Sequence, residues 1–298
     1  MLRQFWPSGD QVFPSKTSHV VRRRRAQARP PAWLLLLALL LAAGCRKPVA
    51  ATDPAQFATD AKRFADQMAQ EQSAKTGQFD ARTFPHLSDD DVAKLSALTH
   101  LVDVNLDNAP ITDAAIASLL PIKGLKRLSM SSTRVTNAGL QHLKNFEHLE
   151  FARFDSSRVG DAGLVHLAAI PNLRELSLYR DVITDAGVPA LIYARRLERI
   201  SLDCTTVGDG ALATLGRLPA LVHLSLWKTG VTDAGLPHLI GAPQLEKLVL
   251  NETQVTDAGL RHLKGVPKLR LLSLQKTAVS AAAIERLEAA MPGLVVDF

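Results

Sequence analysis

The stretch from Leu221 to Gln244 reads Leu-Val-His-Leu-Ser-Leu-Trp-Lys-Thr-Gly-Val-Thr-Asp-Ala-Gly-Leu-Pro-His-Leu-Ile-Gly-Ala-Pro-Gln, and the next 24 residues repeat it closely. A fixed period in this range is typical of a solenoid, in which each unit stacks on the one before it. Eight such units fill residues 101–292 without an insertion, and they begin at Leu101, Leu125, Leu149, Leu173, Leu197, Leu221, Leu245 and Leu269.

Each unit predicts a strand followed by a helix. Apolar residues alternate at positions 4 and 6, as at Leu224 and Leu226, which indicates a strand. Threonine at position 12 is suited to cap the helix that follows, and aspartate next to it favours the helix dipole. Leu236 and Leu239 then recur at helical spacing. Glycine at position 15 we interpret as room for close packing against a neighbouring turn.

Since no unit can bury its apolar edge alone, the units must stack. We expect about nine parallel strands, about 4.8 Å apart, on a concave face, with helices on the convex face. Position 9 is mostly a hydroxyl residue, and a ladder of hydroxyl groups there would satisfy buried backbone groups. The exceptions among the later units include Asp181.

The unit resembles the leucine-rich repeat, whose core reads L-x-x-L-x-L-x-x-N/C-x-L. Here it reads Leu-x-x-Leu-x-Leu-x-x-Thr-x-Val-Thr-Asp-Ala-Gly-Leu-x-x-Leu. The resemblance implies an α/β fold, a right-handed horseshoe with a parallel sheet on the concave face and helices on the convex face. It also implies a binding scaffold, because the family consists mostly of such proteins. Threonine in place of asparagine at position 9 is typical of a bacterial-looking subtype.

The N-terminal region predicts a secretory signal over residues 1–44, and we expect translation to start nearer Val20. Four arginines from Arg22 precede an apolar run, and Gly44 precedes Cys45. This ending resembles the lipobox of bacterial lipoproteins, which implies a diacylated Cys45, although Ala42 stands where the family usually has leucine. A plain signal peptide or an uncleaved anchor is the alternative. The residue after Cys45 is Arg46, whereas the resemblance associates an aspartate at this place with retention in the inner membrane. We therefore expect the protein to be anchored in the outer membrane.

The remaining segments flank the repeats. Residues 45–53 form a tether, and an amphipathic helix is predicted within 54–76 because Phe57, Phe64 and Met68 share one face. That helix either caps the solenoid or docks a partner. Residues 77–298 form the repeat domain, with a partial first repeat at 77–100 and a terminal strand at 293–298.

The charge of the chain excludes nucleic acid as an expected partner. The formal net charge is +6, but residues 1–44 hold seven Lys or Arg and one acid, which leaves 28 basic and 28 acidic residues in the rest. The body is therefore formally neutral, and the basic leader explains the high isoelectric point. We expect a monomer.

The sequence offers no candidate catalytic centre, metal site or cofactor motif. It has no phosphate loop, dinucleotide fingerprint, zinc spacing or nucleophile elbow. The sequence shows no general base or orienting residue next to Cys204, so we interpret it as a free thiol. We interpret the acids at 89–91 as the start of a helix. We therefore expect no enzymatic activity, and we interpret the histidines at position 18 as surface residues: His142, His166, His238 and His262.

The concave face carries the candidate ligand-binding residues. Positions 3, 5, 7 and 8 are expected to point away from the core, with serines as a floor between larger side chains. Tyr179 and Trp227 share position 7, roughly 10 Å apart, and aromatic and arginine anchors are typical of protein interfaces. The candidate residues are Arg127, Phe151, Arg153, Tyr179, Arg180, Arg199, His223, Trp227, Lys228 and Lys247.

Together these features predict a lipid-anchored envelope protein, without catalysis, that binds a protein or peptide on its concave face. The alternative is an intracellular adaptor or secreted effector that recognises a substrate protein. Similar Thr-Asp-Ala-Gly-Leu units occur in the substrate-recognition arms of ubiquitin-ligase adaptors, but those proteins have a separate helical docking domain. Residues 46–76 are too short for one.

Lipidation is directly testable at Cys45. Cys45→Ser should give an unprocessed or soluble protein, because the acylated sulfur is lost. The measurement is incorporation of a fatty-acid probe, followed by fractionation. Labelling of the variant at the wild-type level would contradict the lipoprotein assignment.

Overall fold

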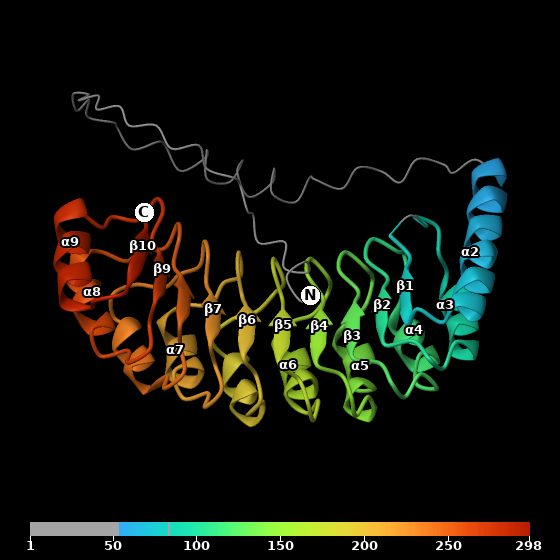
Figure 1. Cartoon of the computed structure of the whole chain (residues 1–298), viewed down its shortest axis with the longest axis horizontal. Helices are drawn as coiled ribbons and strands as arrows, with labels where there is room; N and C mark the ends of the chain where they lie inside the picture. The colour runs from blue at the N-terminus through green and yellow to red at the C-terminus, as the bar shows by residue number, and fades with distance from the viewer. Residues whose placement is uncertain (1–53, 83) are drawn as a thin grey trace, which may run out of the picture. The chain divides into compact units, whose positions relative to one another are not determined.

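The computed structural model describes residues 54–82 and 84–298, and the predicted signal, the tether and Cys45 lie outside these residues. One sheet of ten parallel strands runs through them in sequence order (Figure 1). The strands are β1 (Gln78–Asp80), β2 (Asp103–Asn105), β3 (Arg127–Ser129), β4 (Phe151–Arg153), β5 (Glu175–Ser177), β6 (Arg199–Ser201), β7 (His223–Ser225), β8 (Lys247–Val249), β9 (Leu271–Ser273) and β10 (Val295–Asp297).

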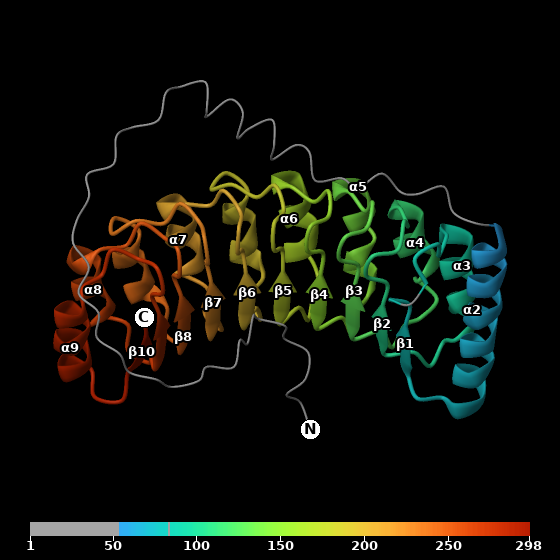
Figure 2. The same cartoon turned by 90° about the horizontal axis from the view of Figure 1, so that it is seen from above.

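Helices connect the strands and lie together along the opposite side, so that the sheet lines the inner side of the arc (Figure 2). The α-helices are α2 (Pro54–Ala74), α3 (Asp89–Lys94), α4 (Asp113–Ser118), α5 (Asn137–Leu140), α6 (Asp161–Ala168), α7 (Asp209–Leu215), α8 (Asp257–Leu263) and α9 (Ala281–Ala290). Short 3₁₀ helices are η1 (Leu95–Ala97), η2 (Leu143–Asn145), η3 (Val188–Tyr193) and η4 (Leu236–Gly241). Pro189 and Pro237 stand in the first turn of η3 and η4.

The sheet has ten strands where we expected about nine, because both degenerate ends pair. β1 pairs with β2 at Gln78↔Asp103, a step of 25 residues rather than 24. The first unit therefore has one more residue between its strand and the buried Leu87 than later units have. At the other end, β10 keeps the regular step, with Val295 opposite Leu271.

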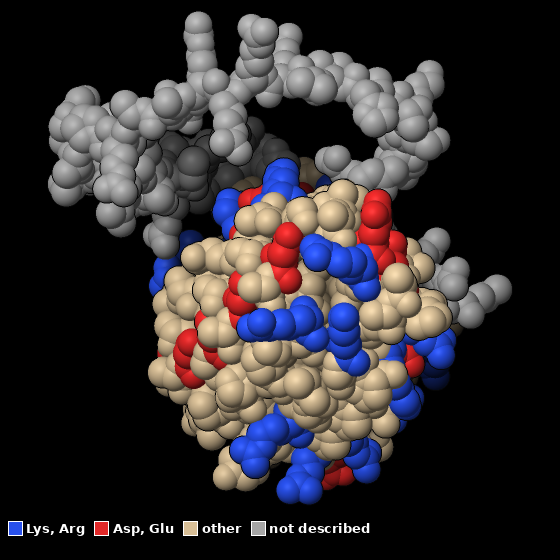
Figure 3. Space-filling model, turned by 90° about the vertical axis from the view of Figure 1, so that its left-hand side faces the viewer, with Lys and Arg blue, Asp and Glu red and all other residues tan. Residues whose placement is uncertain are grey.

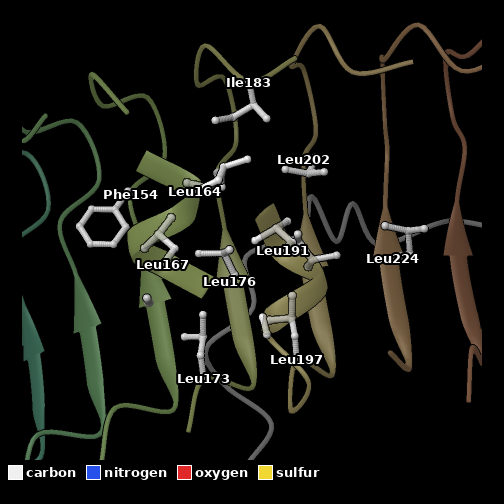
Figure 4. Close-up of a cluster of buried hydrophobic side chains, with 14 of the residues drawn as sticks. Phe154, Leu164, Leu167, Leu173, Leu176, Ile183, Leu191, Leu197, Leu202 and Leu224 are labelled. Atoms are coloured by element: carbon white, nitrogen blue, oxygen red, sulfur yellow. The ribbon is translucent and has the colours of Figure 1, made fainter. Parts of the chain in front are cut away.

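The core lies between the sheet and the helices, and the repeat positions predicted to be apolar fill it. Leu224 of β7, Leu226 directly after it, Val231 of the turn and Leu239 of η4 are fully buried. Figure 4 shows equivalent side chains of neighbouring units, such as Leu173 and Leu197 or Leu167 and Leu191, within one cluster between the sheet and the helices. Each unit thus supplies part of its neighbour's core, which no isolated unit could form.

Backbone hydrogen bonds continue beyond the three-residue strands on both sides of the core. The N–H at position 8 donates to the position 7 carbonyl of the next unit, as from Arg180 to Asp203 at 3.0 Å. Across the core, the N–H at position 10 donates to position 11 of the preceding unit, as from Gly230 to Val207 at 2.8 Å. The ladder leaves few buried peptide groups that need another partner.

The threonine at position 12 does more than cap its own helix. Thr232 Oγ1 accepts from the Ala234 N–H at 3.2 Å, as capping predicts. Its N–H and its hydroxyl donate to Asp209 of the preceding unit at 2.8 and 2.7 Å. The same pair of bonds joins Asp89 to Thr112, Asp113 to Thr136, Asp161 to Thr184, Asp233 to Thr256 and Asp257 to Ser280. The aspartate therefore joins consecutive units.

Glycine at position 15 makes room for this aspartate. The finding confirms the close-packing interpretation and shows that the neighbouring group is the aspartate of the preceding unit. A Cβ on Gly235 would lie 2.5 Å from Asp209 Oδ1, and one on Gly259 would lie 2.3 Å from Asp233 Oδ1. Both distances are below van der Waals contact. The Thr-Asp-Ala-Gly sequence thus encodes one contact between two units.

The threonine hydroxyl groups at position 9 bond within their own unit rather than along the stack. Thr229 Oγ1 donates to the Leu226 carbonyl at 2.7 Å. Thr133, Thr205, Thr253 and Thr277 donate in the same way to the carbonyl three residues earlier. The buried backbone group is satisfied as expected, but each hydroxyl closes a turn instead of forming a ladder.

Helix α2 packs against the first unit. The Phe64 ring makes edge contacts with Phe79 and Phe84, with ring centroids 5.6 and 5.8 Å apart. The buried Glu71 carboxylate accepts from the Gly77 N–H at 2.7 Å and lies 2.9 Å from His100 Nε2. Burial raises the pKa of Glu71, but hydrogen bonds from Thr76, Gly77 and His100 outweigh it and hold the pKa below its usual value. These contacts favour a capping role for α2.

The position of a leucine in the stack should determine its contribution to stability. Leu226 is fully buried between units, whereas Leu294 beside the terminal strand is 7% exposed. Leu226→Ala should lower the free energy of unfolding by about 2–5 kcal/mol, the range for a truncated core leucine. Leu294→Ala should cost clearly less. Denaturant unfolding measures both, and equal losses would contradict a stack in which each unit depends on its neighbours.

The contact between Asp209 and Gly235 is testable by a double-mutant cycle. Gly235→Ala should destabilise by about 1–3 kcal/mol, because the new methyl group overlaps Asp209 Oδ1 and Leu212. Gly124→Ala is the matched control, since its Cβ would meet only the Leu101 carbonyl, at 3.8 Å. Adding Asp209→Ala should recover part of the Gly235→Ala loss. Strictly additive losses in chemical denaturation would show that the glycine does not accommodate the aspartate.

Candidate functional site

The strand register places equivalent residues of successive units side by side in columns. Position 3 forms the column Asp103, Arg127, Phe151, Glu175, Arg199, His223, Lys247 and Leu271. Positions 7 and 8 follow each strand and form two further columns at one rim of the sheet. The candidate residues therefore lie on one surface.

Tyr179 and Trp227 stack on one another across the unit between them. Their ring centroids are 6.2 Å apart, with 14° between the ring planes. The rings are thus much closer than the roughly 10 Å expected from two strand spacings. Asp203 is the position 7 residue of the unit between them, and its carboxylate accepts from the Trp227 backbone N–H at 2.7 Å and from the Ser201 hydroxyl at 3.0 Å.

Charged and polar groups surround the aromatic pair. The Arg180 guanidinium lies 5.1 Å from the centroid of the Tyr179 ring. Burial, followed by the proximity of Cys204, raises the pKa of the Tyr179 hydroxyl. Glu252 accepts hydrogen bonds from Lys276 and from the Trp227 indole, and these lower its pKa. The pair therefore has polar contacts on both sides and forms a platform that is partly exposed to solvent.

Position 8 is in the left-handed conformation in every full unit, although no glycine occupies it. Arg180, Cys204 and Lys228 have φ values of 60°, 57° and 55°. Side chains there cost more than glycine would, by about 1–2 kcal/mol each. Arg180 and Lys228 are nevertheless exposed beside the aromatic pair. The same conformation occurs at Asn108, Ser132 and the other position 8 residues, so it belongs to the repeat turn and does not single out the basic residues.

The serines at position 5 do not form an open floor, which corrects the sequence-based expectation. Ser129, Ser177, Ser201 and Ser225 are buried. Their hydroxyls donate hydrogen bonds to the aspartates of position 7, as from Ser129 to Asp107 and from Ser177 to Asp155, both at 2.6 Å. Burial raises the pKa of Asp155 and of Asp203. These polar groups satisfy one another and leave the large side chains as the contact surface.

The surface around the aromatic pair is also less basic than the sequence suggests. Arg199 forms an ion pair with Glu175 of the neighbouring strand. Burial, with Lys247 and Arg199 adding to it, lowers the pKa of His223 to about 3. His223 is therefore neutral near pH 7. Arg180 and Lys228 remain as the exposed cations next to the rings.

Phe151 belongs to a second cluster and is not an exposed anchor. Its side chain is only 4% exposed, and the guanidinium carbons of Arg127 and Arg153 lie 4.0 and 5.4 Å from its ring centroid. Arg127 also lies 3.4 Å from Asp103, and Arg153 lies 3.6 Å from Asp155. A ligand here would contact the arginines, with Phe151 as their support.

The other candidate groups have structural explanations. Asp89 binds Thr112 of the next unit, and Asp91 completes a capping box with Ser88, so the acidic run begins a helix. His142, His166, His238 and His262 lie on the helical side, away from the sheet. Among the described residues, no group of three or more His, Cys, Asp or Glu could hold a metal ion. Basic and acidic side chains are interspersed over the C-terminal end (Figure 3).

Comparison with known proteins identifies the architecture. No model of a known protein family matches the chain, and no curated protein matches it. A crystal structure of internalin C2 from Listeria monocytogenes is similar, with a TM-score of 0.55 and 20% sequence identity, over 67% of this chain and 82% of that chain. The fold is a leucine-rich repeat solenoid. At this identity the likeness establishes the fold alone.

Leucine-rich repeat solenoids, like other solenoids, present an extended concave surface suited to binding. In this solenoid the sheet provides that surface, and the Tyr179–Trp227 pair is its aromatic centre. The positions that carry the pair were predictable from the repeat, whereas the stacking and the neutral His223 depend on three-dimensional neighbours.

Proposed function

We propose that the protein binds a protein or peptide partner on the concave face, at the Tyr179–Trp227 pair and its flanking cations, without catalysis. The observation that carries the proposal is the stacked pair itself. Two large rings stack on one another and remain partly exposed, and the stacking contact reduces the side-chain entropy that is left to lose when a partner covers them. Aromatic and arginine side chains of this kind dominate the binding energy of protein interfaces.

The chemistry of the platform favours a partner segment with an apolar anchor next to acidic groups. The rings offer apolar area, and Arg180 and Lys228 offer positive charge beside it. The acids of the same surface, Asp155 and Asp203, are engaged by serine hydroxyls and backbone N–H groups. They would oppose an acidic partner less than free carboxylates would.

The proposal includes anchoring of the solenoid in a bacterial envelope through lipid on Cys45, with the outer membrane favoured. It is supported by the basic, apolar and small-residue order before Cys45 and by Arg46 after it. Within residues 54–82 and 84–298, no helix is long and apolar enough to cross a bilayer.

The test is capture of binding partners from envelope extract, followed by affinity measurement with the captured protein. Trp227→Ala should weaken binding about thirtyfold or more, equivalent to about 2 kcal/mol, because a central aromatic anchor is lost. Lys228→Glu should mainly slow association, and less so at high salt.

The control is His142→Ala combined with His166→Ala on the helical side, which should change neither affinity nor association rate. Thermal unfolding must show that each variant keeps the fold. Loss of binding in the histidine variant, with full binding in Trp227→Ala, would place the interface on the convex face instead.

A further inference from the structure

Asp181 departs from the pattern of position 9, and its surroundings favour a protonated carboxyl group. It occupies the place where Thr133, Thr205, Thr229, Thr253 and Thr277 stand in other units. In those five units the side-chain hydroxyl donates to the carbonyl of position 6, at 2.6–2.7 Å. A carboxylate has no hydrogen to donate there, but a neutral carboxylic acid has one.

The surroundings of Asp181 leave one carboxyl oxygen without a partner. The side chain is 4% exposed. Its Oδ1 accepts from the Ser157 N–H at 2.8 Å and from the Ser157 hydroxyl at 3.1 Å. Its Oδ2 is buried and makes no hydrogen bond to another group. An unpaired anionic oxygen in such a place is costly, whereas a protonated one can bond the Leu178 carbonyl as threonine does elsewhere.

The charged groups around Asp181 also favour the neutral form. Burial raises the pKa of Asp181 most, and repulsion by Asp155 of the preceding unit raises it further. Arg180, beside it in the chain, is exposed and lies over the Tyr179 ring. Burial is the largest cause, and together with Asp155 it raises the pKa of Asp181 to about 7 against the opposing Ser157 bonds.

We propose that Asp181 is a proton-dependent latch: the neutral acid donates from Oδ2 to the Leu178 carbonyl, across the turn that carries Tyr179 and Arg180, and the carboxylate loses this bond. The backbone bond from the Asp181 N–H to the same carbonyl, at 3.3 Å, is present in both states, so the side-chain bond is an addition to it. The turn is well placed to transmit the change. Tyr179 and Arg180 lie between the two bonded residues, and Tyr179 is one half of the stacked pair. The latch itself is a property of the fold, and only its effect on partner capture rests on the proposed function.

The direction of the pH effect follows from proton binding. The folded state holds the Asp181 proton up to about pH 7, whereas the unfolded chain releases it near the ordinary value of 3.8. Stability from this group is therefore complete at low pH, falls as the pH rises between these values, and is lost above about pH 7.

The experiment compares the full-length protein with Asp181→Thr, which restores the hydroxyl of the other units. The ratio of their folding equilibrium constants, measured by denaturant unfolding, should shift in favour of Asp181→Thr by about tenfold per pH unit from pH 5 to pH 7 and level off above. Carbon NMR of the wild-type Asp181 carboxyl group should show a titration midpoint near 7, independently of any variant.

A matched gain-of-function variant tests whether the position confers the effect. Thr253→Asp, made in the Asp181→Thr protein, places a carboxyl group at a buried position 9 elsewhere in the stack. It should introduce a new loss of stability at high pH. A pH-independent ratio between wild type and Asp181→Thr, or a carboxyl titration near pH 4, would overturn the latch. If the unfolding ratio and the carboxyl titration behave as expected but partner capture is equally strong at pH 6 and pH 8.5, the latch exists and does not affect binding.

Discussion

The pair of hydrogen bonds from Thr232 to the Asp209 carboxylate of the preceding unit, repeated along the stack, is the interaction on which the rest of the structure depends. One carboxylate satisfies two donors of the neighbouring unit, and the threonine that receives this support then caps its own helix. The helix start of each unit is thus fixed by the unit before it. A charge-assisted bond of this kind is stronger than a neutral one, and its geometry sets the spacing of the helical side.

The aspartate packs against position 15 of the next unit, and at Gly235 the missing Cβ leaves room for it. Glycine is not required for the bonds, because Asp89 and Asp257 make them where Ala115 and Ala283 stand at this position. Where Asn137 or Asp185 stands at the aspartate position opposite a glycine cap, the side chain still accepts the N–H of that glycine. The function of the motif is therefore acceptance of a backbone N–H, with the threonine hydroxyl as a second bond. The backbone hydrogen bonds on the strand side also join equivalent positions of successive units, so the units are linked on both sides of the core.

The concave face separates polar groups that stabilise the fold from those that can meet a partner. The acids at position 7, Asp107, Asp155 and Asp203, are engaged by serine hydroxyls and by backbone N–H groups. Tyr179 and Trp227 flank Asp203 in this column, and their rings stack across the unit between them. The surface left to solvent is consequently aromatic and moderately basic, although its column of position 3 contains several charges. Ion pairing of Arg199 and deprotonation of His223 remove most of that charge.

By itself the sequence determined the repeat length, the strand and helix positions, the threonine caps and the fold, because each depends on the period of apolar residues and on local chemistry. It also placed Tyr179 and Trp227 in one column, since a fixed period implies a fixed register. Only the tertiary structure decided what those columns do. The partner of Asp209 lies one unit away, the covering of Phe151 comes from two neighbouring arginines, and the neutral state of His223 depends on burial between Arg199 and Lys247. Such properties arise from distances between units, and a one-dimensional pattern does not contain them.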